Sequence, residues 1–436
     1  MRRLLILLAL VLLATVVIWK TGGALLPVRA EQQAAASAPA TPAGHIDSSA
    51  LRQQILHDDQ IDDDALHHID ERGNKLVSAA AYFEAAKYEY ENKRFDTSLT
   101  YLQRALEIAP DQAAFHHLYM ALLLEQGQYE DAVAQGERAA ELAPDSVEVQ
   151  RLLGVAYYNA RKLDKAVAAW ERAQKLAPAD AIAQNLAKAK RELTVEGNFS
   201  ELALGHFVLR YEGGKPAEVL SSELLQTLER QYGDLRADLV SAPSMVIVVT
   251  LYSKQQFSDV TLAPDWAGGL NDGSLRIPVG DITEVTPLLE TVLKHELTHS
   301  FVHAIAPNCP VWLNEGLAQM EEGKSSILLP PLLRKQLDKA DAASLHSLEG
   351  PFTGLNSEQA QVAYAKSLAA TEFLRDTYGL PGIRRLLTML AEGKDTEMAL
   401  RELTDGGYDG LERELQTYLA RLNPPSEPRA AQTHGQ

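Results

Sequence analysis

The residues best suited to chemistry lie in one short stretch, His295-Glu296-Leu297-Thr298-His299. Side chains four residues apart lie on one face of a helix, so the imidazoles of His295 and His299 can both reach one metal ion. Glu296 points to another side of that helix, where its carboxylate can take a proton from water without binding the metal. The spacing therefore predicts a zinc site with its own general base.

A catalytic zinc site needs three protein ligands, so this pentapeptide is incomplete. Pro307 and Pro310 end the first helix and turn the chain, and a second helix then returns antiparallel to the first. Counted outward from that turn, Glu315 comes level with the first helix within about one turn of His299, roughly 5 Å along the axis. A glutamate side chain covers that distance, and we predict Glu315 as the third ligand.

Two other residues near this stretch could be mistaken for ligands. His303 lies about 12 Å from His295 on a straight helix and cannot share one tetrahedral ion with it. Cys309 is the single cysteine, so a cysteine-based zinc site and an intrachain disulfide are both excluded. We expect His303 to be a surface or supporting residue.

Upstream of the metal ligands the chain repeats itself. Pro110, Pro144 and Pro178 recur every 34 residues, and other positions keep the same step. This pattern resembles the tetratricopeptide repeat (TPR), which implies an α-solenoid of helix pairs over 79–112, 113–146 and 147–180. A helix over 182–193 caps the array in this interpretation, so that the TPR region spans 78–195. The resemblance implies a protein or peptide partner, with a purely structural spacer as the alternative.

After Gly197 the pattern changes to mixed structure. Residues 206–211 and 245–251 have the composition of strands around a helix over 217–239, and the Gly-rich segment 268–273 leads into a strand at 274–279. From Val285 onward the chain is mainly helical. We therefore predict an α+β, predominantly helical protein whose second domain covers 199–422.

The second domain resembles the gluzincin metallopeptidases, especially compact peptidase-MA-like domains. The resemblance is carried by His295 to His299 followed by Trp312-Leu313-Asn314-Glu315-Gly316-Leu317-Ala318. It implies that His295, His299 and Glu315 bind one Zn²⁺ and that Glu296 activates water. The Gly-Ala-Met-Glu-Asn sequence of the large aminopeptidases is missing, so exopeptidase specificity has no support.

The same resemblance implies two further features of the site. An edge strand lies over the zinc in this family and pairs with substrate, and residues 274–279 suit that role, although the glycines of the preceding segment 268–273 could equally form only a hairpin turn. A Tyr or His commonly stabilises the oxyanion. Tyr364, expected to open a helix, is the candidate for this catalytic role, with an ordinary packed tyrosine as the alternative and His346 as a second choice.

The two ends of the chain differ from the domains between them. Arg2 and Arg3 precede an apolar run from Leu4 to Trp19, which predicts a signal peptide or N-terminal membrane anchor over 1–30. The rest of the chain is then extracytoplasmic, in the periplasm, either anchored in the inner membrane or secreted. Residues 31–77 are predicted as a flexible linker and 423–436 as a disordered tail. The acidic stretch from Asp58 to Asp64 either extends this linker or begins a helix.

Charge narrows the range of partners. The formal net charge of -18 argues against nucleic acid as a partner, because phosphate binding requires clustered Lys and Arg. The sequence as a whole predicts an exported zinc peptidase, an endopeptidase with a TPR array that recruits a protein or peptide. The alternative is a cell-envelope TPR scaffold whose zinc domain is catalytically silent.

Overall fold

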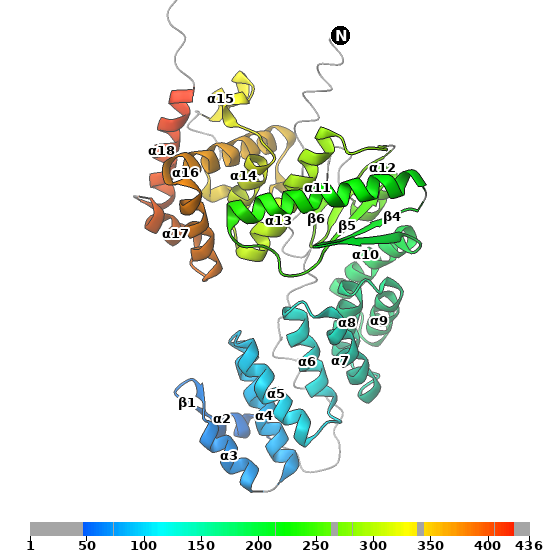
Figure 1. The fold of residues 1–436 in the computed structure, drawn as a ribbon. Coiled ribbons are helices and arrows are strands. Elements are labelled where there is room, and N and C mark those ends of the chain that lie inside the picture. The colour runs from blue at the N-terminus through cyan, green and yellow to red at the C-terminus, as the bar shows by residue number, and fades with distance from the viewer. Residues whose placement is uncertain are drawn as a thin grey trace, which may run out of the picture. The chain divides into compact units, whose positions relative to one another are not determined.

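The computed structural model describes residues 47–72, 74–213, 215–262, 269–280, 282–337, 344–404 and 406–422. The chain divides into two compact units between Gly197 and Asn198, which are described separately (Figure 1). The predicted signal or anchor at 1–30 and the predicted tail at 423–436 lie outside the described residues. Among the helices that are described, none is long and apolar enough to cross a bilayer.

The first unit is built from antiparallel helix pairs. The pairs are α4 (Lys75–Glu91) with α5 (Phe95–Ile108), α6 (Ala113–Glu125) with α7 (Tyr129–Leu142), and α8 (Val147–Asn159) with α9 (Leu163–Leu176). Small residues at equivalent positions let the helices of a pair pack closely, since Ala105, Ala139 and Ala173 are all fully buried. The second and third pairs fall within the predicted repeats 113–146 and 147–180, and the first pair begins four residues before the predicted repeat 79–112.

The links within and between pairs also follow the 34-residue step. Lys93, Gly127 and Arg161 connect the two helices of successive pairs, each in the left-handed conformation with φ of 59°, 69° and 58°. Two of these positions therefore hold a non-glycine residue where glycine is the least strained choice. Between pairs, Arg138 contacts Asp111 at 2.5 Å and Arg172 contacts Asp145 at 3.2 Å, so the same ion pair recurs one repeat later.

The array ends in a longer helix, α10 (Asp180–Glu196), where a capping helix is predicted over 182–193. Its Glu192 accepts a hydrogen bond from Tyr158 at 2.6 Å and pairs with Arg161 at 3.2 Å. Ile182 and Ala189 are buried against the last pair. The apolar face of that pair is thereby covered.

The prediction of a flexible linker over 31–77 is wrong for the part of that range which the structure describes. Helices α2 (Ser48–Ile55) and α3 (Asp63–Glu71) flank a short hairpin of β1 (Leu56–His57) and β2 (Gln60–Ile61). Leu51, Ile55 and Leu66 form a small core with α4. Asp47 and Asp62 act as N-caps of the two helices, so for α3 the alternative that the acidic stretch begins a helix is the correct one.

The second unit contains a five-stranded sheet in the order β3-β4-β5-β7-β6. Its strands are β3 (Ser200–Leu204), β4 (Phe207–Tyr211), β5 (Ile247–Tyr252), β6 (Leu270–Asn271) and β7 (Leu275–Pro278). The three inner strands are parallel, and the two edge strands are antiparallel to their neighbours. The strand predicted at 274–279 is therefore an inner strand, and the prediction that it forms the edge is wrong, because the two-residue β6 pairs alongside it.

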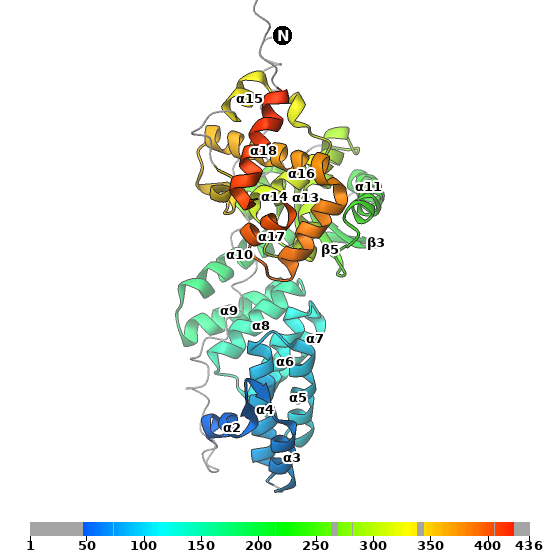
Figure 2. The same ribbon diagram turned by 90° about the vertical axis from the view of Figure 1, so that its left-hand side faces the viewer.

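Helices cover this sheet and complete the unit. They are α11 (Lys215–Leu239), α12 (Lys254–Thr261), α13 (Pro287–Ile305), α14 (Val311–Glu321), α15 (Pro331–Leu337), α16 (Ser357–Ala391), α17 (Thr396–Leu403) and α18 (Gly407–Leu422), with short 3₁₀ turns η1 (Ser326–Leu328), η2 (His346–Leu348) and η3 (Phe352–Gly354). Gly379 interrupts α16 with a φ of 66°. The predicted fold class, α+β and predominantly helical with a small sheet, is confirmed (Figure 2).

Candidate metal centre

Helices α13 and α14 form the hairpin that carries the predicted ligands. Thr286 caps α13 by accepting a hydrogen bond from the Leu289 backbone N–H at 3.2 Å, and Pro287 occupies the first turn. Pro310 starts α14 after the turn. Leu293, Leu297 and Phe301 are fully buried and fix the rotation of α13, so its polar residues are turned towards α14.

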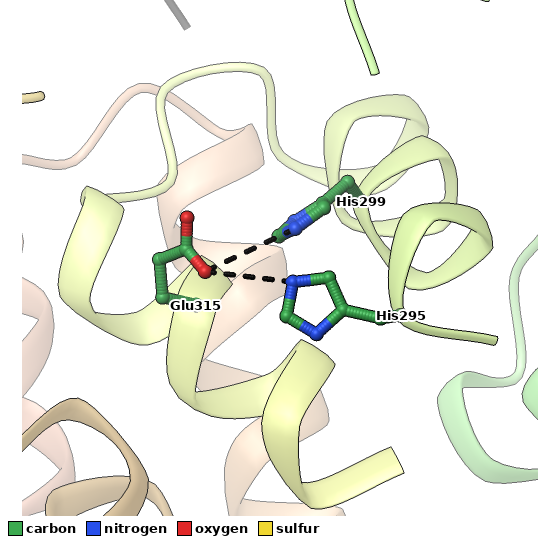
Figure 3. Close-up of side chains that lie close together, drawn as sticks. All are labelled: His295, His299 and Glu315. Carbon is green, nitrogen blue, oxygen red and sulfur yellow. Dashed lines mark ion pairs between the residues drawn. The ribbon is translucent and has the colours of Figure 1, made fainter. Parts of the chain in front are cut away.

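The structure brings the three predicted ligands together. His295 and His299 extend from α13 and Glu315 extends from α14, and one ligand atom of each lies within 4.8 Å of the others (Figure 3). Glu315 Oε2 is 3.7 Å from His295 Nε2 and 4.0 Å from His299 Nε2. All three side chains are buried.

These residues fit a zinc ion in geometry and in donor type. Zinc bonds of about 2.1 Å in a tetrahedron place ligand atoms roughly 3.4 Å apart, close to the two distances above. His299 Nε2 and Glu315 Oε2 are buried and make no hydrogen bond within the described part of the chain. Burial, together with the neighbouring His295, lowers the pKa of His299 well below its usual value, which favours the neutral ring that binds metal.

Two other side chains orient the imidazoles. His299 Nδ1 donates to Asn314 Oδ1 at 2.9 Å, which leaves Nε2 of that ring facing the ligand cluster. His295 Nδ1 lies 3.3 Å from Glu322 Oε1, and Lys324 Nζ lies 2.6 Å from the same oxygen. Burial alone would raise the pKa of Glu322, but His295 and Lys324 hold it below the usual value, so the group is a carboxylate.

Glu296 is buried beside the ligands without binding them. Neither of its carboxylate oxygens makes a hydrogen bond to a described residue, and burial together with the charge of Glu322 raises its pKa well above the usual value. Gly269 lies against this carboxylate, and a methyl group there would sit 2.7 Å from Glu296 Oε1. Asn271 on β6 donates from Nδ2 to the Glu296 backbone carbonyl at 2.8 Å and to Ser300 Oγ at 2.7 Å.

Tyr364 lies near this group, but not at a helix start. It sits two turns inside α16, since that helix begins at Ser357. Burial and the charges of Glu315 and Glu296 raise the pKa of the Tyr364 hydroxyl well above its usual value. The hydroxyl is therefore protonated at neutral pH and can donate a hydrogen bond.

The two remaining histidines considered in the sequence lie elsewhere. The ring centroid of His346 is 5.1 Å from that of Tyr408, and its Nδ1 is 3.9 Å from Glu349 Oε1. His303 is exposed on α13 and does not belong to the ligand cluster.

Sequence reasoning missed Glu322, Gly269 and Asn271. Glu322 follows Glu315 by seven residues, two helical turns, so the same-face rule could have identified it. Gly269 and Asn271 reach the site only because β6 lies against α13. A two-residue strand has no periodicity from which that crossing could be predicted.

Family comparisons agree with this arrangement. The model of the Peptidase MA superfamily matches residues 230–421, and two tetratricopeptide repeat models match residues 89–135 and 122–181. The chain joins tetratricopeptide repeats to a Peptidase MA superfamily domain. The first unit is accordingly called the TPR array and the second the peptidase domain. The resemblance seen in the sequence is confirmed at this level.

Comparisons with solved structures find TPR proteins. The Arabidopsis OM64 TPR domain is 15% identical with a TM-score of 0.27, and the match covers 27% of this chain and 98% of that one. MamA 41-end from Desulfovibrio magneticus RS-1 is 18% identical with a TM-score of 0.26, covering 34% and 86%. The comparison with curated proteins found no match.

Proposed function

We propose that the peptidase domain is a zinc-dependent endopeptidase. The observation that carries this proposal is the buried cluster of His295, His299 and Glu315, with the Glu296 carboxylate buried beside it. The buried carboxylates of Glu315 and Glu296 repel each other when both are charged, and a divalent cation offsets that repulsion. The buried ligand atoms without hydrogen bonds are explained by the same cation.

Each residue has a distinct task in the proposed reaction. Zinc, when bound, supplies a Lewis acid that polarises a carbonyl oxygen and makes water more acidic. Glu296 accepts the proton of the attacking water and delivers it to the departing amine. Tyr364 donates a hydrogen bond to the carbonyl oxygen as it gains negative charge. Asn314 and Glu322 keep the two imidazoles in position.

The TPR array recruits a protein or peptide in this proposal. Tetratricopeptide repeats generally mediate protein–protein interactions, and two repeat models match this part of the chain. We propose a periplasmic location, with residues 1–30 acting as a membrane anchor or signal peptide. The basic residues before the apolar run from Leu4 to Trp19 support that orientation.

The decisive experiment replaces the proposed base. Glu296→Gln should keep the fold and the zinc content measured by elemental analysis, and it should slow cleavage of an unfolded protein by about 10²- to 10⁴-fold. Full cleavage by a zinc-loaded Glu296→Gln protein would refute the assigned base. If the same variant restores function in a deletion strain at normal protein level, the chain acts as a scaffold.

A further inference from the structure

The segment that follows α14 exposes a group of large apolar side chains. Ile327 in η1 is 55% exposed, and Leu328 and Leu332 are each 79% exposed, the two highest values among the large exposed hydrophobic residues of the described chain. Pro330 and Pro331 between them are also exposed. We call Ile327, Leu328, Pro330, Pro331 and Leu332 the apolar tip. Contiguous exposed apolar groups of this kind mark an interaction surface.

The apolar tip has a fixed position. Leu329 and Leu333 pack on the core of the peptidase domain, and Leu337 is buried. Glu372 on α16 accepts hydrogen bonds from both the backbone N–H and the hydroxyl of Ser326. The inner side of this segment therefore packs on the domain without help from Leu328 and Leu332, which remain exposed. In both views α15 lies at an outer edge of the domain (Figures 1 and 2).

The charge around the apolar tip is opposite to that of the chain. From Ser325 to Leu337 the sequence contains Arg334 and Lys335 and no Asp or Glu, in a chain with a formal charge of -18, while Lys324 just before this stretch is paired with Glu322. Arg334 donates to the Ile327 carbonyl at 3.0 Å, which holds its guanidinium next to the apolar tip. Aliphatic side chains beside lysine and arginine are typical of protein surfaces that rest on anionic membranes.

We propose that the apolar tip inserts into the surface of a lipid bilayer that contains anionic lipids. The positive charge distinguishes this occupant from a second copy of the chain, because two copies meeting at this surface would bring their cations together. The proposal goes beyond peptide hydrolysis and uses the proposed membrane placement of residues 1–30 only as a reason for a bilayer to be near.

The position of the apolar tip links it to the metal site. Its first residue, Ile327, follows three positions after Lys324, whose ammonium contacts Glu322, and Glu322 in turn contacts His295. Because α14 leads into this segment, insertion would hold the domain that carries the metal site at the bilayer surface. Substrates would then be cleaved next to the membrane.

The test uses the full chain with single fluorescent labels. Native Cys309 is replaced by Ala, and one cysteine is introduced as Leu332→Cys, as Met398→Cys, or as Leu12→Cys in the predicted anchor. Met398 is the control, because it is an apolar residue of the same domain that is 51% exposed. Each variant carries an environment-sensitive dye and is reconstituted into vesicles of phosphatidylcholine and phosphatidylglycerol, with and without quenching lipids labelled on the acyl chain.

We expect the lipid quenchers to reduce the fluorescence of the dye at position 332 and not that of the dye at position 398. Replacing Arg334 and Lys335 by Gln should weaken the quenching at position 332. Quenching at position 12 without any at 332 would overturn the proposal and leave the anchor intact. A blue shift at 332 without lipid quenching would also overturn it, since a protein then covers the apolar tip.

Discussion

The side chains around the proposed zinc site form two short chains of contacts. One runs from His295 through Glu322 to Lys324, and the other joins His299 to Asn314. Both start at the ring nitrogen that faces away from the ligand cluster. Each imidazole is therefore oriented before a metal arrives, which reduces the entropy lost on binding.

Replacing Glu322 by Gln tests one of these contacts. The amide keeps the size of the side chain but removes the charge next to His295, so zinc affinity should fall by about 10- to 100-fold. Competition with a fluorescent chelator measures this change. Glu321→Gln is the matched control, because Glu321 pairs with Lys294 at 3.3 Å and touches no ligand. Equal affinities of the two variants would contradict the role given to Glu322.

Replacing Tyr364 by Phe separates catalysis from packing. The phenyl ring keeps the edge contact with Phe352, whose centroid lies 5.3 Å away, and loses only the hydroxyl. We expect kcat to fall by about 10²- to 10³-fold with KM little changed, as for loss of an oxyanion donor. Steady-state kinetics with one peptide gives both values. An unaltered kcat would leave Tyr364 as an ordinary packed tyrosine.

At the scale of elements, the ligand hairpin depends on how closely α14 approaches α16. A methyl group at Gly316 would overlap Thr371 and the backbone carbonyl of Ser367. Gln319 also donates to the Tyr364 carbonyl at 3.0 Å, which ties the same two helices together. The helix that carries Glu315 is thus held in one position by its neighbour.

Gly316→Ala should consequently destabilise the peptidase domain by about 1 to 3 kcal/mol, because the rigid backbone of α16 cannot give way. Thermal unfolding monitored by circular dichroism measures the effect. Gly233→Ala in α11 is the control. A methyl group there meets nothing within 4 Å, so the better helix former should raise stability by about 0.5 to 1 kcal/mol.

The ligand hairpin was predictable because prolines mark both sides of its turn and the ligand spacing is local. The order of the strands was not. Residues 274–279 have the composition of a strand, but composition does not say whether a strand lies inside a sheet or at its edge. β6 occupies that edge with only Leu270 and Asn271, too few residues for any pattern. The crossing that places Gly269 at Glu296 followed from this unpredicted strand.

At the scale of the molecule, the sequence placed the change from repeats to mixed structure at Gly197, where the two units separate. The 34-residue step made the array predictable, since the same residue types recur at the same positions in each repeat. Helix α2 was missed because it is short and occurs once, and α3 because its acidic start is equally compatible with a linker. A short helix that occurs only once leaves little pattern in the sequence beyond its capping residues.

Two units with separate cores should unfold separately. Zinc binds only the native peptidase domain in our proposal, so removing it with a chelator should lower the unfolding temperature of one transition and leave the other unchanged. A loss of about 2.7 kcal/mol corresponds to a free zinc concentration of roughly 100 times Kd. Differential scanning calorimetry resolves both transitions. A shift of both, or of neither, would contradict the assignment of the metal to one unit.

The recurring ion pair of the TPR array makes the array extensible. Arg138 meets Asp111 from the link before its own pair, and Arg172 meets Asp145 in the same way. A duplicated copy of residues 113–146 would contain its own Arg138 and Asp145. Its arginine would pair with the aspartate of the preceding link, and its aspartate would pair with the arginine of the following helix pair. The chain could therefore gain a repeat by duplication, or lose one by deletion, and every arginine and aspartate of this series would still have a partner.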